Sequence, residues 1–231
     1  MQLLRQGRWR FLIRHMVGLC AGLLLCLVLL LPHPVRAEDV VDLYEELKLA
    51  QPIAVPPYEL PQAEEGLAEA QAVDVMHDTG HDFLRITRHL ADEREDVIEL
   101  ALWLDAEGAP LLGLSERQVE KGVPVLGRVR FYSRASGRWN LVTPQTLPDV
   151  SASLCKLPPS AKDRLPEDEP FRPIAFVLPQ QGADLQVWCL RDAPAAGQAM
   201  WLRWNGAQAD FSPGPALKGA PPWQKGDVPQ Q

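Results

Sequence analysis

Apolar residues alternate with other residues over much of the chain between residues 82 and 212, which is the period that a half-buried β-strand imposes. Isoleucine or leucine occupies every even position of residues 98–104, and valine, glycine or phenylalanine occupies every odd position of residues 125–131. Turn-forming residues follow each run and lead into a second apolar run, at 111–114 and 139–142 respectively. Both arrangements predict a β-hairpin.

Three further short runs in the last part of this region favour strands. They are residues 174–178, 185–190 and 200–204. Asn205-Gly206 follows the last run and precedes Phe211, and this dipeptide is the strongest short-range signal for a hairpin turn. Seven or eight short strands with little helical periodicity predict a mainly β fold, either an antiparallel sandwich or a small barrel.

A helical pattern precedes the strands. Within residues 38–50, apolar side chains recur at Val40, Leu43, Tyr44 and Leu47 with acidic residues between them. This spacing predicts a short amphipathic helix whose acidic first turn suits a helix N-terminus. The helix is also a candidate docking arm for a partner.

The composition divides the rest of the chain into segments. Prolines interrupt the chain directly after the helix, so we interpret residues 38–72 as the amphipathic helix followed by a proline-rich linker. The β-rich globular domain then spans residues 73–212. Residues 213–231 are rich in Pro, Gly, Lys and Gln, which predicts a disordered tail.

Residues 1–37 have the composition of a secretory signal peptide. The first fifteen residues carry four arginines and no acidic residue, and residues 16–31 form an unbroken apolar run. Val35-Arg36-Ala37 presents short side chains at the positions that a signal peptidase reads, so we expect cleavage after Ala37. The alternative is an uncleaved inner-membrane anchor, although the apolar run is shorter than the ~20 residues that cross a bilayer as a helix. Either way, we expect the domain to be exported, as a periplasmic or secreted protein.

Removal of this leader makes the chain more acidic. Five arginines leave, so Lys plus Arg falls from 23 to 18 while Asp plus Glu stays at 30, and the formal net charge moves from -7 to -12. An acidic surface repels phosphate backbones and anionic lipids. We therefore expect no nucleic-acid partner, and contact with a membrane only if the leader remains attached.

Two cysteines, Cys155 and Cys189, lie outside the leader. An even pair of cysteines in an exported protein predicts a disulfide, which here closes a loop of about 34 residues and stabilises the fold by ~3–4 kcal/mol. The alternative is a redox-active pair, but the two residues lack the Cys-x-x-Cys spacing of such motifs. We predict a structural bridge.

Two His-Asp pairs and a third histidine lie in one short segment. His77, His81 and His89 follow one another at intervals of four and eight residues. On a helix they share one stripe, and imidazoles four residues apart bind divalent metals with carboxylates as outer partners. Gly80 weakens a helix at this point, so we favour an exposed polar loop that enters the first strand, with the metal site as the alternative. A divalent metal is the one cofactor that the sequence suggests.

Ser153 and Lys156 match the Ser-x-x-Lys spacing that supplies a nucleophile and a base in penicillin-recognising enzymes. The match stands alone, because the companion Ser-Asp-Asn and Lys-Thr-Gly elements of those enzymes are missing. We therefore assign no catalytic role to the pair.

Aromatic and basic side chains supply two candidate binding surfaces. Trp188, Trp201 and Trp204 cluster in the last predicted strands, and an exposed tryptophan commonly holds a sugar ring or a peptide. Arg128 and Arg130 alternate on one face of a predicted strand and form a candidate patch for an anion or a partner. The structural interpretation of both groups is ordinary packing of a sandwich.

The sequence carries no convergent set of nucleophile, base and oxyanion donors. We therefore predict a non-catalytic, exported domain of the cell envelope that binds a protein or a cell-wall component. The alternative is a metal-binding protein or a metal-dependent enzyme that uses the three histidines.

Overall fold

The computed structural model describes residues 39–56, 73–158 and 170–225. The predicted signal peptide, most of the predicted linker and the last six residues lie outside the described ranges. Among the described residues, no helix is both long enough and apolar enough to span a bilayer.

Six antiparallel strands form the larger of two sheets, and each strand pairs with its neighbour in the sequence. The strands are β1 (Val73–Asp78), β2 (Phe83–His89), β3 (Arg94–Leu104), β4 (Pro110–Glu120), β5 (Val123–Ala135) and β6 (Arg138–Leu141). The predicted hairpins at 98–114 and 125–142 are confirmed as β3–β4 and β5–β6. The hairpin β1–β2 was not predicted, because polar residues interrupt the apolar alternation in β1.

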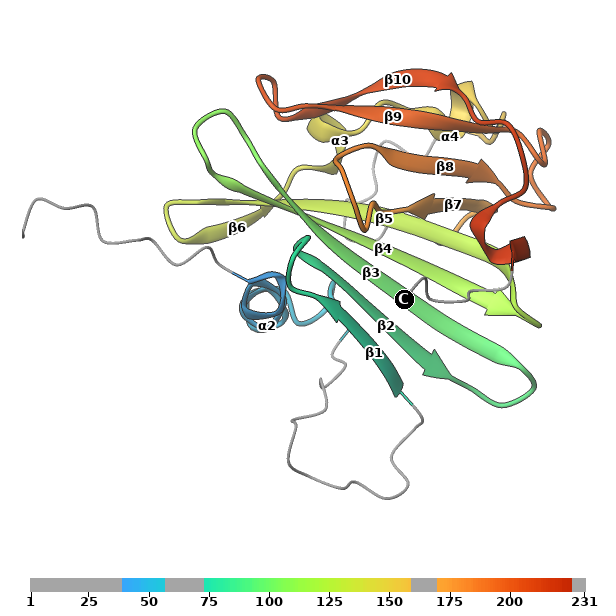
Figure 1. Ribbon diagram of the computed structural model, residues 1–231, viewed down its shortest axis with the longest axis horizontal. Coiled ribbons are helices and arrows are strands. Elements are labelled where there is room, and N and C mark those ends of the chain that lie inside the picture. The colour runs from blue at the N-terminus through green and yellow to red at the C-terminus, as the bar shows by residue number, and fades with distance from the viewer. Residues whose placement is uncertain (1–38, 57–72, 159–169, 226–231) are drawn as a thin grey trace, which may run out of the picture. The chain divides into compact units, whose positions relative to one another are not determined.

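The second sheet has four antiparallel strands in the order β10-β9-β8-β7. They are β7 (Ile174–Val177), β8 (Leu185–Cys189), β9 (Ala199–Asn205) and β10 (Asp210–Ala216). Asn205 pairs with Asp210 at the end of β9–β10, so the turn predicted from Asn205-Gly206 is confirmed. The two sheets form a mainly β, sandwich-like fold and do not close into a barrel (Figure 1).

The predicted start of a disordered tail at residue 213 is wrong. β10 continues to Ala216, and a short 3-10 helix, η2 (Pro222–Lys225), follows it. Trp223 of this helix packs edge-on against Trp188, with 5.8 Å between the ring centroids. Burial of these two large rings orders the segment that composition alone predicted to be disordered.

Helix α2 (Val40–Ala50) covers the outer face of the six-stranded sheet, the face opposite the second sheet (Figure 1). The Asp39 side chain caps the helix by accepting a hydrogen bond from the Val41 N–H at 2.9 Å. The four predicted apolar positions are all buried against the sheet. The helix is therefore part of the domain core, and its interpretation as a free docking arm is wrong.

The main core lies between the two sheets and is rich in aromatic side chains. The ring centroids of Trp103 and Phe211 are 5.4 Å apart and meet edge to face. Gly127 of β5 allows the sheets to meet, because a Cβ at this position would lie 2.5 Å from the Ile174 carbonyl oxygen of β7. The Gly127 N–H also donates to the Arg172 carbonyl at 2.7 Å.

Candidate functional site

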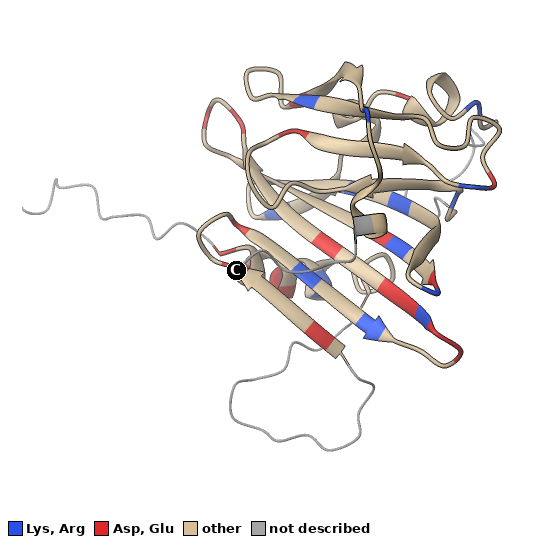
Figure 2. Cartoon of the chain, turned by 45° about the vertical axis from the view of Figure 1, so that its right-hand side comes forward, with Lys and Arg blue, Asp and Glu red and all other residues tan. Residues whose placement is uncertain are grey.

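A small hollow lies on the outer face of the six-stranded sheet. Its volume is about 180 Å³, and its walls are Asp96, Val97, Ile98, Glu116, Arg117, Gln118 and Phe171. Glu116 pairs with Ile98 across β3 and β4, and side chains of paired residues share a face. The hollow therefore begins where the apolar surface under α2 gives way to charged residues. Figure 2 shows acidic and basic positions side by side on neighbouring strands of this sheet.

Two arginines share the Glu116 carboxylate at this hollow. Arg128 donates from Nε to Oε2 at 2.7 Å and from Nη2 to Oε1 at 2.9 Å, and Arg130 donates from Nη2 to Oε2. The Arg128 guanidinium also lies over the Phe171 ring, 4.4 Å from its centroid. Two guanidinium groups therefore bind one carboxylate beside the hollow.

Arg130 lies deeper than the sequence indicated. The residue is 1% exposed, and within the described residues its Nε and Nη1 atoms have no hydrogen-bond partner. The predicted surface patch therefore does not include Arg130, because both faces of this part of β5 are covered. Arg128 is partly exposed, with its guanidinium bound to Glu116.

A second charged cluster lies on the opposite face of the sheet, between the two sheets. Glu99 is fully buried and binds Arg85 at 2.9 Å and Arg117 at 2.6 Å. Its Oε2 atom accepts the Leu178 N–H of the second sheet at 3.1 Å. Burial by itself raises the pKa of Glu99, but the charges and hydrogen bonds of the two arginines hold it below the usual range. This cluster joins the two sheets.

The three histidines do not lie on one helical stripe, because the segment is not helical. His77 belongs to β1, His81 to the turn that follows, and His89 to the end of β2. Strand geometry turns successive side chains to opposite faces, which separates residues that a helix would align. Among the described residues, no group of three His, Cys, Asp or Glu side chains is placed to hold a metal ion.

Each histidine instead pairs with its own carboxylate. His77 binds Asp39 at 2.9 Å, His81 binds Asp78 at 3.0 Å, and His89 binds Asp74 at 2.8 Å and Glu95 at 3.0 Å. The hydrogen bond to Asp74 raises the pKa of His89. The His77–Asp39 pair connects β1 to the cap of helix α2, so at least this histidine has a structural role.

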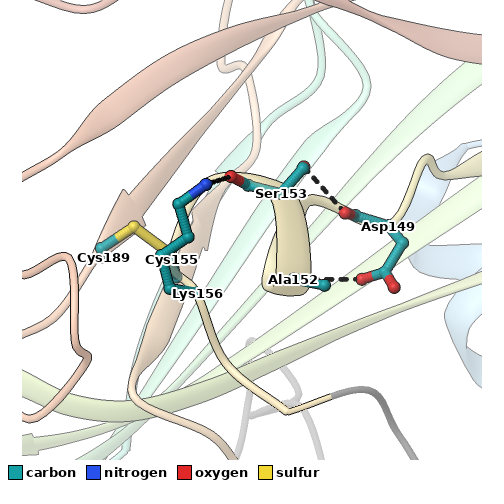
Figure 3. Close-up of a disulfide and its surroundings, with 6 residues drawn as sticks. All are labelled: Asp149, Ala152, Ser153, Cys155, Lys156 and Cys189. Atoms are coloured by element: carbon teal, nitrogen blue, oxygen red, sulfur yellow. Dashed lines mark hydrogen bonds between the residues drawn. A yellow bond between two sulfur atoms is a disulfide. The ribbon is translucent and has the colours of Figure 1, made fainter.

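The predicted disulfide joins Cys155 to Cys189 (Figure 3). It connects the end of the short helix α4 (Val150–Ser153) to β8, and both cysteines are buried in the core between the sheets. The structural role predicted for the pair agrees with this position.

Ser153 and Lys156 do not form a nucleophile–base pair (Figure 3). The Ser153 hydroxyl donates to the Asp149 carbonyl at 2.8 Å, and Lys156 Nζ donates to the Ser153 backbone carbonyl at 2.7 Å. Both side chains complete local backbone hydrogen bonds at the ends of α4.

The three predicted tryptophans occupy different environments. Trp204 packs into the main core against Trp103 and Phe211, and Trp188 is covered by Trp223. Trp201 is half-buried on the outer face of β9 and belongs to none of the apolar clusters of the described residues. It is therefore the one of the three that can contact a ligand without repacking of the core.

Sequence reasoning missed the hollow itself. Glu116, Asp96 and Phe171 come from three distant positions, and none belongs to a motif. The one available signal was that Glu116 and Arg128 alternate with apolar residues in neighbouring strands, but their pairing depends on the register of β4 and β5.

No protein-family model, no curated protein and no solved structure matches this chain. Its function is therefore inferred from the geometry of the described residues.

Proposed function

We propose that this protein is an exported, non-catalytic domain of the cell envelope that binds a protein or a cell-wall component. The observation that carries the proposal is the Cys155–Cys189 disulfide in the main core. Disulfides persist in oxidising compartments and are rare in the bacterial cytoplasm. The basic and apolar leader in residues 1–37 supports the same location.

The outer-face hollow supports a binding role. It combines charged side chains, the Gln118 amide and the Phe171 ring around one cavity, which are groups that orient a ligand. At about 180 Å³ it is smaller than the ~300–1,000 Å³ of typical small-molecule sites. It therefore suits one side chain or one sugar ring of a larger partner.

Export is tested by expression of the full chain and analysis of the protein recovered from the periplasmic and membrane fractions. We expect a processed form that begins at Glu38 and contains the oxidised Cys155–Cys189 pair. Recovery of only the full-length, reduced chain from the cytoplasm would contradict the proposal.

Binding is tested by the retention of the mature protein on two probes, purified cell-wall sacculi and immobilised envelope proteins. Arg128→Ala removes the partly buried guanidinium that binds Glu116 beside the hollow, and Arg138→Ala removes an exposed arginine of the β5–β6 hairpin as a control. We expect Arg128→Ala to reduce retention roughly ten-fold and Arg138→Ala to leave it unchanged. Equal retention of both variants would show that the hollow is not the binding site.

A further inference from the structure

The two sheets have four edges within the described residues, at β1, β6, β7 and β10. An edge strand presents unpaired backbone N–H and C=O groups, and another extended chain can add to it. Natural sheets block such edges with prolines, bulges, short strands, charged side chains or covering segments. The four edges of this protein differ in whether they carry such a block.

Three of the edges are blocked. β10 contains Pro213 and Pro215 and shifts register between Pro213 and Ala216. β7 is short and begins beside the backbone bridge between Gly127 and Arg172, which ties this edge to β5. β6 has only four residues.

Among the described residues, the edge at β1 carries no proline, bulge or covering strand. Its six residues pair with β2 in continuous register without a bulge, and the strand contains no proline, glycine or lysine. No other strand of the described residues pairs with its outer side. About half of the backbone groups of an edge strand point outward, so β1 offers roughly three N–H and three C=O groups to an added chain.

The side chains of β1 give this edge a charge. Asp74 and Asp78 lie on one face with Met76 between them, and the Asp74 side chain is 80% exposed. Val73 and Val75 lie on the other face and contact the apolar cluster under α2. An added strand therefore meets two aspartates, each bound to a histidine, on one face, and the two valines with His77 on the other.

A second copy of β1 does not suit this edge. In the antiparallel register centred on Met76, Asp74 of each copy lies opposite Asp78 of the other, and like charges directly opposite one another destabilise a strand pair. A strand with lysine or arginine at alternate positions places a positive charge opposite each aspartate.

We propose that β1 is a strand-addition site that binds an extended segment of a partner protein with basic residues at alternate positions. The inference rests on the proposed function, since it names the class of partner that the exported domain binds. It concerns a surface separate from the outer-face hollow, so each is tested on its own residues.

The probe is a synthetic peptide of about eight residues in which lysine and valine alternate, a length that covers β1. Its control has the same charge but carries two adjacent central prolines, which cannot donate to a strand pair. Peptide is titrated into the mature protein while backbone amide signals and amide hydrogen exchange are followed by NMR. We expect saturable shifts and slowed exchange confined to residues 73–78, with no comparable effect of the proline peptide.

Two charge reversals accompany the titration. Asp74→Lys places a cation opposite the lysines of the peptide and should weaken binding roughly five-fold or more. Asp192→Lys makes the same charge change at an exposed position between β8 and β9 and should leave the affinity unchanged.

Three results would overturn the inference. They are no response at residues 73–78, equal binding of the proline peptide, or equal weakening by the two charge reversals. Loss of peptide binding at β1 would leave the Arg128→Ala test of the hollow unaffected, so failure of this inference is distinguishable from failure of the proposed function.

Discussion

The Oε1 atom of Glu99 lies 2.6 Å from Nη2 of Arg117, and both residues are buried between the two sheets. Arg117 also donates to the Phe176 carbonyl at 3.3 Å, and Glu99 accepts from the Leu178 N–H at 3.1 Å. The pair therefore connects β3 and β4 to the backbone at the end of β7. Charged side chains between sheets are costly to bury unless they are paired, so the geometry of this cluster contributes to how the sheets align.

Glu99→Gln should destabilise the fold strongly. The substitution keeps the shape of the side chain but leaves the Arg117 charge without its anion, and breaking a buried pair in this way costs about 3–5 kcal/mol. The free energy of unfolding from denaturant titration measures the effect. Glu107→Gln, at an exposed turn position, should change it by less than about 0.5 kcal/mol, and equal effects would contradict the role of Glu99.

The same carboxylate should make stability depend on pH. The folded-state pKa of Glu99 is below its unfolded value of about 4.3, so the folded protein resists protonation at this site. Its contribution is complete above the unfolded pKa and is lost as pH falls through the folded pKa.

Denaturant titrations between pH 7 and pH 3 should therefore show stability falling below about pH 4.3, and falling less steeply in Glu99→Gln than in the natural chain. If stability falls equally with pH in the two proteins, other carboxylates cause the acid sensitivity.

The disulfide should stabilise the domain measurably. Cys155 and Cys189 are 34 residues apart, and the chain-entropy model assigns a bridge of that span about 3–4 kcal/mol. We expect the double variant Cys155→Ala/Cys189→Ala to lose roughly this amount and to become insensitive to reductant. If the natural protein keeps its Tm after complete reduction of this disulfide, the bridge does not stabilise the domain.

Gly127→Ala should separate the sheets locally. The added methyl group would meet the Ile174 carbonyl oxygen at 2.5 Å, and overpacking of this kind costs about 1–3 kcal/mol. Gly80→Ala is the matched control, since its methyl group would meet only the Asp78 side chain at 3.5 Å. Thermal unfolding should show a lower Tm for Gly127→Ala and an unchanged Tm for Gly80→Ala. Similar Tm values for the two variants would mean that the sheets can move apart freely.

The amino-acid sequence by itself determined the local elements of this protein. Alternation identified β3, β5 and their partner strands, because each hairpin pairs residues that are close in the chain. Asn205-Gly206 indicated the last turn, which joins Asn205 of β9 to Asp210 of β10. With only two cysteines outside the predicted leader, the sequence also indicated which residues form the bridge.

The tertiary structure alone decided which faces meet. The alternation of apolar residues predicts a strand with one buried face. In β3 both faces are buried, because Leu100 packs under α2 while Glu99 and Trp103 pack toward the second sheet. Glu99 and Leu178 are 79 residues apart, so their contact exists only after the sheets have stacked. The same holds for Glu116 with Arg128, whose pairing depends on strand register rather than on either residue's neighbours. The same holds for the three histidines, since their spacing has meaning only once strand or helix geometry is known.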